Sequence, residues 1–281
     1  MKFFAYLVFS LGIFTSLEAV SISSVTHLGR PHLRVITQSA TYLYDPVAGG
    51  FSSIIDQHGQ DWVAYKDQPW GEYPAAAASS YRGVPNLVFR SEDDGAGHPG
   101  HQKCKSQVID GTKIVTESLS GKWTWNWTFT ERYARLEVTK VDPEHPYWFL
   151  YEGPAGGAYL PRQTYWGSNQ GGPNFSRYDH YRGSVRRDHF QWMYFGSAGS
   201  KASFFMAMTE LDQHPDHYSL LGNTASGIDS PDGMVVAGFG RTEGATPLLR
   251  EPAVFYIGIY PRAIKRPKQH RRLGRFISRI F

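Results

Sequence analysis

The chain has 281 residues, with 29 lysines and arginines, 25 aspartates and glutamates, and one cysteine. This length suits one large domain or two small ones, and a single cysteine excludes a disulfide framework. Eight basic residues and no acidic ones lie within residues 262–281, so the other 21 basic and 25 acidic residues carry a net charge of −4, and a nucleic-acid-binding face is not expected.

The first residues have the composition of a secretory signal. Lys2 precedes an apolar run from Phe3 to Phe14, and small residues follow that would permit cleavage after Ala19 or Ser21. The run is shorter than the roughly 20 apolar residues that a membrane-spanning helix needs. We therefore expect residues 1–21 to be a signal peptide and the mature protein to be soluble and secreted or periplasmic.

Alternation of apolar and polar residues dominates the rest of the chain, which is typical of antiparallel strands. Strands are expected over residues 40–44, 114–119, 123–129, 134–139, 147–151, 202–208, 234–239 and 253–260. The short link Thr130–Arg132 between two of them predicts a hairpin. The stripe formed by Trp123, Trp125 and Trp127 is expected to lie in the core.

Three long segments separate predicted strands, over residues 68–85, 91–105 and 153–187. Loops of this length are usually functional or disordered, and these are too aromatic for disorder. No change of composition divides the chain. We predict an all-β fold, with residues 22–261 forming a single large antiparallel β-sandwich with little helix. Residues 262–281 are expected to be a basic C-terminal tail, either solvated and partly disordered or in contact with an anionic surface or polysaccharide.

Aromatic residues in the long loops lie beside hydrogen-bonding side chains. Sugars present apolar C–H faces bordered by hydroxyl groups, so a sugar-binding cleft needs flat rings flanked by polar groups. The sequence therefore predicts a poly- or oligosaccharide ligand. The candidate substrate-binding residues are Trp70, Tyr73, Asn86, Lys103, Tyr165, Trp166, His217 and Tyr218.

The densest polar cluster lies between Tyr81 and Lys105. A lyase that cleaves a uronate-containing polysaccharide by β-elimination must neutralise the uronate, abstract the C5 proton and protonate the leaving oxygen. The cluster offers cations and an amide for the first task, and a phenol and two imidazoles for the others. The candidates are Arg82, Asn86 and Lys103 for neutralisation, and Tyr81, His98 and His101 for proton transfer.

A glycosidase would instead need two carboxylates on either side of the scissile bond. Glu152 is the best single candidate because it ends a predicted strand just before Gly153 and Pro154, and Asp212 or Asp216 could be its partner. No nucleophile elbow, phosphate loop or dinucleotide fingerprint is present. The candidate catalytic residues are thus Tyr81, Arg82, His98, His101 and Glu152.

Two short motifs repeat the pattern His-Pro-x-His, at residues 98–101 and 214–217. Two imidazoles three residues apart could converge on a metal such as zinc, with carboxylates completing the shell. The proline in each motif equally favours a turn, and direct use in catalysis is a third possibility. The sequence implies no other cofactor.

Several stretches resemble a group of exported bacterial proteins, namely residues 44–56, 81–88, 148–153, 193–196, 214–216 and 237–241. The order of strands is similar to that of the galactose-mutarotase-like super-sandwich, which aldose epimerases share with domains of polysaccharide lyases and hydrolases. This resemblance implies a sugar-facing cleft. The expected function is a secreted carbohydrate-active enzyme, either a polysaccharide lyase or a glycosidase, and the alternative is a non-catalytic sugar-binding protein.

Overall fold

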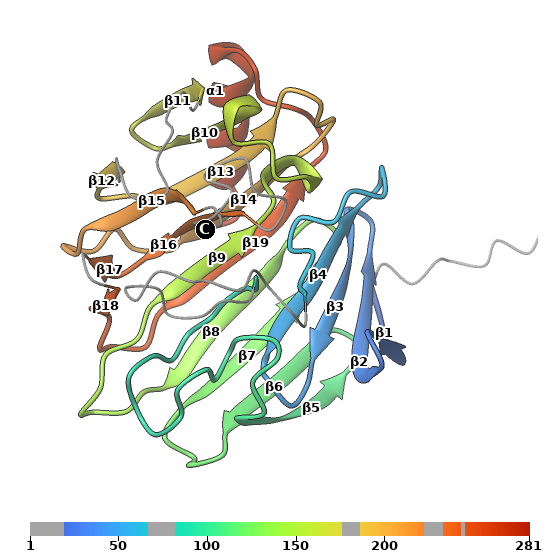
Figure 1. Cartoon of the computed structure of the whole chain (residues 1–281), viewed down its shortest axis with the longest axis vertical. Helices are drawn as coiled ribbons and strands as arrows, with labels where there is room; N and C mark the ends of the chain where they lie inside the picture. The colour runs from blue at the N-terminus through green and yellow to red at the C-terminus, as the bar shows by residue number, and fades with distance from the viewer. Residues whose placement is uncertain (1–19, 67–81, 176–185, 222–232, 243–244) are drawn as a thin grey trace, which may run out of the picture.

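The computed structural model describes residues 20–66, 82–175, 186–221, 233–242 and 245–281. Within them the fold is mostly β, with large antiparallel sheets and one α-helix, as predicted (Figure 1). No helix in these ranges is long and apolar enough to cross a membrane. Residues 1–19 of the predicted signal lie outside the described ranges, and the first strand begins at Val20.

The largest sheet has nine strands. In spatial order they are β11 (Gly171–Phe175), β10 (Thr164–Ser168), β13 (Trp192–Ser197), β14 (Ser203–Met208), β19 (Val254–Tyr260), β8 (Ala134–Lys140), β7 (Thr124–Phe129), β6 (Lys113–Ser118) and β5 (Cys104–Asp110). The predicted hairpin is confirmed, because β7 and β8 pair from Phe129 opposite Ala134. The alternation in β7 buries Trp125 and Trp127 completely, while Thr124, Asn126 and Thr128 stay partly exposed.

Two smaller sheets form most of the facing layer. The first has the order β1 (Val20–His27), β2 (Arg30–Thr37), β3 (Ala40–Asp45) and β4 (Gly50–Asp56), and the second has the order β12 (Arg186–Asp188), β15 (Asp216–Leu221), β16 (Met234–Phe239) and β9 (Phe149–Gly153). A separate two-stranded ribbon joins β17 (Arg241–Thr242) to β18 (Thr246–Pro247).

The segment that starts at Arg82 connects these two sheets into one layer. The backbone N–H of Phe51 in β4 donates to Val84 O at 2.8 Å, and Gly83 exchanges two backbone hydrogen bonds of 2.9 Å with Glu152 in β9. Residues 83 and 84 therefore bridge β4 and β9. Since the resulting layer packs against the nine-stranded sheet, the fold is a two-layer sandwich (Figure 1).

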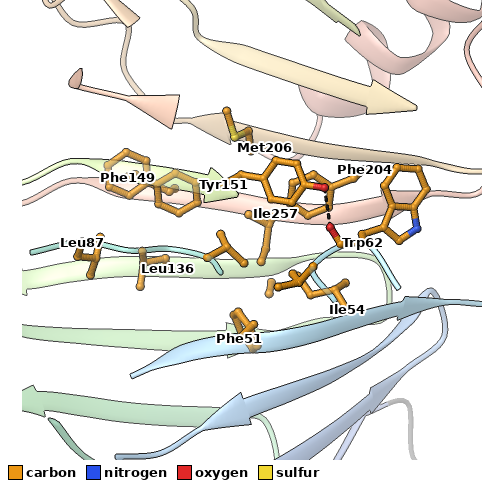
Figure 2. Close-up of a cluster of buried hydrophobic side chains, with 14 of the residues drawn as sticks. Phe51, Ile54, Trp62, Leu87, Leu136, Phe149, Tyr151, Phe204, Met206 and Ile257 are labelled. Carbon is orange, nitrogen blue, oxygen red and sulfur yellow. Dashed lines mark hydrogen bonds between the residues drawn. The ribbon is translucent and has the colours of Figure 1, made fainter. Parts of the chain in front are cut away.

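Aromatic side chains fill the space between the two layers (Figure 2). Tyr151 of β9 packs on Phe204 of β14 with ring centroids 4.3 Å apart, and its hydroxyl donates to Trp62 O at 2.6 Å. Phe149 stacks on Phe255 of β19 at 4.7 Å. Burial of each such ring contributes roughly 1.5–3 kcal/mol, so these contacts dominate the energy that holds the layers together.

The sequence-based account of residues 153–187 as one long loop is wrong in its middle. Two short 3-10 helices, η1 (Ala155–Gly157) and η2 (Pro161–Gln163), lead into β10 and β11, which extend the nine-stranded sheet. Glycine, proline and polar residues make these strands look irregular in sequence. Pairing with β13, whose residues are almost all buried, stabilises β10 despite its composition.

The basic C-terminal segment is also different from the expected disordered tail. Residues Pro267–Ile277 form α1, with Leu273 and Ile277 buried. They pack with Tyr165, Tyr194 and Phe205 on the outer face of the nine-stranded sheet. The apolar residues recur at helical spacing among the arginines, so the helix has a face to bury that the high charge obscures.

Candidate functional site

The candidate site lies on the face of the β9, β16 and β15 sheet that points away from the sandwich core. Side chains alternate along these strands. Tyr151 and Tyr218 contact Phe195 of the opposite sheet, so they point inward. Glu152 is next to Tyr151 and His217 is next to Tyr218, so both point outward. Leu150 also points outward and packs with Trp148 and Ala245 in a small cluster outside the main core.

Glu152 is the centre of a buried polar cluster. Its Oε2 accepts a hydrogen bond of 2.8 Å from Asn86 Nδ2 and lies 3.2 Å from His98 Nε2. The exposed fraction is 2% or less for all three residues. Two of the three come from the predicted polar cluster at 81–105 and the third from the end of β9, so the fold brings together candidates that lie 54 and 66 residues apart in sequence.

The hydrogen-bond chemistry of His98 requires a shared proton. Its Nδ1 lies 2.8 Å from Pro99 O, which can only accept, so Nδ1 carries a hydrogen. Its Nε2 faces a carboxylate oxygen, and an unprotonated Nε2 would then place two acceptors in contact. One further proton must therefore lie between Nε2 and Oε2, either on the imidazole or on the carboxyl group. Such a proton is available for transfer to a reacting group.

A glycine-rich loop holds His98 and Asn86 against β9. Asn86 and Val88 donate backbone hydrogen bonds to Gly97 and Ala96, and Leu150 of β9 donates to Pro85 O. Gly83 allows a close approach to His98, because a β-carbon there would lie 2.5 Å from Pro99 Cδ and 3.1 Å from His98 Nε2. The absence of a side chain at Gly83 thus lets His98 reach Glu152. In the sequence, the only signal for this role is the Arg-Gly-Val pattern beside the candidate residues.

His101 lies at the more exposed end of the cluster. Its ring meets the ring of His98 edge-on, with centroids 5.5 Å apart, and the side chain is partly exposed. Burial, together with the nearby His98 and Lys103, lowers the pKa of His101 to about 4. At neutral pH the imidazole is therefore uncharged and can accept a proton. Lys103 points elsewhere, since its Nζ lies 3.4 Å from Glu92 O.

Arg82 is buried and joins three parts of the layer. Its guanidinium donates to Ala64 O at 3.1 Å and to Gly233 O at 2.9 Å. The ring of Tyr159 packs so closely on Gly233 that a β-carbon there would overlap it. Because these two hydrogen bonds go to backbone carbonyls, Arg82 has a structural task in addition to the predicted neutralisation of a carboxylate.

Several predicted substrate-binding residues do not line this site. Tyr165 and Trp166 are neighbours in β10 and point to opposite faces: Tyr165 packs beneath α1, and Trp166 stacks on Tyr218 at 4.5 Å inside the sandwich. All three rings are at most 7% exposed, so their assignment as sugar platforms is corrected to a packing role. Trp70, Tyr73 and Tyr81 lie outside the described residues, and His217 is 2% exposed on the outward face.

The second His-Pro-x-His motif does not form a metal site with the first. Among the described residues, only Asp142, Glu144 and His145 bring three possible ligand atoms within 4.8 Å of one another, and neither motif contributes to that group. Asp216 in the second motif accepts backbone hydrogen bonds of 2.8 Å from Phe190 and Gly240. Burial raises the pKa of Asp216 to about 8. The motif therefore fixes the start of β15.

Asp216 and Asp212 also do not pair with Glu152. Asp216 is two residues from Tyr218 along β15 and therefore lies on the same, inward face of the layer. Glu152 points outward. Asp212 precedes the strand and accepts a hydrogen bond of 2.8 Å from the backbone of His214. The second carboxylate that a glycosidase needs is therefore not supplied by either predicted partner.

Comparison with known proteins identifies the fold. No family model matches the sequence, and no curated protein matches it. The structure is similar to that of HI1317, with a TM-score of 0.54 and 11% identity over 90% of this chain and 98% of that chain. It is also similar to a galactose mutarotase related enzyme from Lactobacillus acidophilus, with a TM-score of 0.51 and 7% identity over 83% and 98% of the two chains.

A third similar structure is a 4-alpha-glucanotransferase from Thermococcus litoralis. The TM-score is 0.50 and the identity 8%, over 87% of this chain and 42% of that chain. Identities this low establish a shared fold and not a shared activity. The chain therefore has a galactose-mutarotase-like fold, as the resemblance in its sequence implied.

Proposed function

We propose that the protein is a carbohydrate-active enzyme in which Glu152, His98 and His101 transfer protons to and from a sugar. The observation that carries the proposal is the contact of 3.2 Å between Glu152 Oε2 and His98 Nε2, in a cluster with 2% exposure or less. A proton shared across this contact would be available to a reacting group. The fold supports a sugar substrate, since two of the similar structures are a galactose mutarotase related enzyme and a 4-alpha-glucanotransferase.

Among sugar reactions, the cluster favours β-elimination from a uronate-containing polysaccharide over hydrolysis. Hydrolysis needs a second carboxylate opposite Glu152, and Asp216 does not supply it because it lies on the other side of the layer. Elimination needs one base and one acid. His101 is uncharged at neutral pH, and its side chain is partly exposed although Nε2 is buried, so it is the group proposed to accept the C5 proton. The C4–O bond would break as the C4–C5 double bond forms, and the proton of the Glu152–His98 pair would pass to the leaving oxygen.

The alternative is a non-catalytic sugar-binding protein, and the near-complete burial of Glu152 and His98 is the observation that favours it. A polysaccharide panel separates the two functions. We expect incubation with polygalacturonate, alginate or a glucuronan to raise the absorbance of an unsaturated uronate. New reducing ends without that absorbance would indicate a hydrolase, and saturable binding without any product would indicate the sugar-binding alternative.

A further inference from the structure

A groove lies between the C-terminal part of α1 and the ends of the central strands β7, β8 and β19 of the nine-stranded sheet, on the side of the sandwich opposite to Glu152. It has a volume of about 930 Å³. One wall is the β7–β8 hairpin together with the segment after β19, and the other wall is the helix. The volume is within the range of roughly 300–1,000 Å³ that is typical of ligand sites.

Five arginines converge on this groove. They are Arg132, Arg262, Arg272, Arg275 and Arg279. Arg272 and Arg275 are three residues apart on one side of α1, and Arg279 follows in the turn just after the helix ends at Ile277. All five side chains are exposed, and Glu131 is the only acidic residue in the lining. Arg132 lies over the ring of Phe276, 5.8 Å from its centroid, and within the described residues none of the five forms an ion pair. The positive charge of the groove is therefore not neutralised by a paired carboxylate in this part of the chain.

We propose that this groove binds an anionic oligosaccharide that carries sulfate or carboxylate groups. A guanidinium donates two parallel hydrogen bonds to such an oxyanion, and several in one groove would hold successive charged groups along a chain. Tyr133 and Tyr260 also line the groove and are partly exposed, so they offer ring surface to the C–H faces of sugars.

A membrane surface fits the groove less well. A helix that lies in a bilayer interface must insert its apolar face into the lipid. In α1 that face is already used, because Leu273 and Ile277 are buried against the sheet. A flat surface also cannot enter a groove between two walls. The site is separate from the Glu152 cluster, so the proposal does not rest on the proposed chemistry.

The test is calorimetric titration of the whole chain with dextran sulfate, polygalacturonate, neutral dextran, a DNA 20-mer and phosphatidylglycerol vesicles. We expect saturable binding of dextran sulfate, of polygalacturonate or of both, and none of neutral dextran. The triple variant Arg272→Ala, Arg275→Ala, Arg279→Ala should weaken that binding by about tenfold or more, because three guanidinium donors to the oxyanions are lost.

The matched control is Arg266→Ala, Lys268→Ala, Arg271→Ala, which removes the same charge from exposed residues outside the groove lining. Circular dichroism and melting temperature would establish that both variants fold. Retention of affinity in the control, with loss in the groove variant, supports the site. Equal losses in both, absence of binding to either anionic glycan, or tighter binding of DNA or vesicles would overturn it.

Discussion

At the scale of single residues, the Glu152 cluster has a clear division between buried and accessible groups. Glu152, His98 and Asn86 are enclosed, and His101 provides the partly exposed end. A carboxylate and an imidazole that hold one proton in a dry environment interact strongly, because the local dielectric constant is low. Substitutions that disturb this contact should therefore alter activity before they alter the fold.

The loop around Gly83 provides one such test. Gly83→Ala would place a methyl group 2.5 Å from Pro99 Cδ and 3.1 Å from His98 Nε2. We expect His98 to be pushed from Glu152, with most activity lost and about 1–3 kcal/mol of overpacking cost. Gly111→Ala is the control, since no atom lies within 4 Å of a β-carbon there. Activity and urea unfolding measure both effects, and a Gly83→Ala enzyme as active as the control would contradict the close packing.

The lowered pKa of His101 predicts a pH dependence of stability. The unfolded chain protonates this residue near its usual pKa of 6.5, whereas the folded chain resists protonation until about pH 4. The unfolded state thus binds more protons between these values, and stability falls as the pH drops from 6.5 toward 4. The urea midpoint should therefore fall further between pH 7 and pH 5 for the native protein than for the His101→Gln variant. Equal falls would show that His101 titrates normally.

At the scale of elements, the sheets depend on strict alternation. Trp127 of β7 is fully buried against Phe51 of the opposite layer, with ring centroids 4.8 Å apart, while its neighbour Thr128 is partly exposed. Trp127→Ala should destabilise the protein by about 3–5 kcal/mol because it leaves a large cavity. Thr128→Ala should change stability by less than about 1 kcal/mol. Similar losses for the two variants would contradict the assigned faces.

Alternation also explains which elements the sequence could predict. The strands predicted over residues 114–119, 123–129, 134–139, 202–208, 234–239 and 253–260 have long apolar runs or regular alternation, and the structure confirms them within a few residues. The strand β10 was missed, because its glycine and serine give no pattern until the pairing with β13 is known. The helix α1 was missed because its arginines conceal two buried apolar residues.

The candidate site was predictable only in part. Glu152, His98 and Asn86 were each chosen for their chemistry, but their contact depends on how the loop from Arg82 inserts between β4 and β9. Tyr165 and Trp166 show the converse, because they are neighbours in sequence but lie on opposite faces of the sheet. Both are aromatic, yet along the pleat of β10 Tyr165 lies beneath α1 and Trp166 lies in the core. Composition cannot reveal such a difference; only the register of the strand can.

At the scale of the whole molecule, the two outer faces of the sandwich have different charge and different proposed roles. The acid–base cluster lies on one face, and the groove with five arginines lies on the other. An enzyme with this arrangement could hold an anionic polysaccharide at the groove while another part of the same polysaccharide reaches the cluster. Binding and turnover should therefore be separable by mutation.

If the predicted signal peptide directs export, the start of β1 predicts where it is cleaved. Val20 and Ser21 pair with Thr37 and Ile36 as the first residues of β1. Cleavage after Ala19 leaves this strand whole, whereas cleavage after Ser21 removes two paired residues. We expect the secreted protein to begin at Val20, and N-terminal sequencing of the exported product checks it. A product that begins at Ile22, or one that stays uncleaved, would contradict the prediction.

The most direct test of the central claim is the activity of Glu152→Gln on whichever uronate-containing polysaccharide the panel identifies. Glutamine keeps the size of the side chain and an acceptor for Asn86, but it cannot share the proton with His98. The account predicts a fall in kcat/KM of about 10²–10⁴-fold, the usual contribution of an acid–base group, with little change in melting temperature. A folded Glu152→Gln protein that retains the activity of the native protein would contradict it.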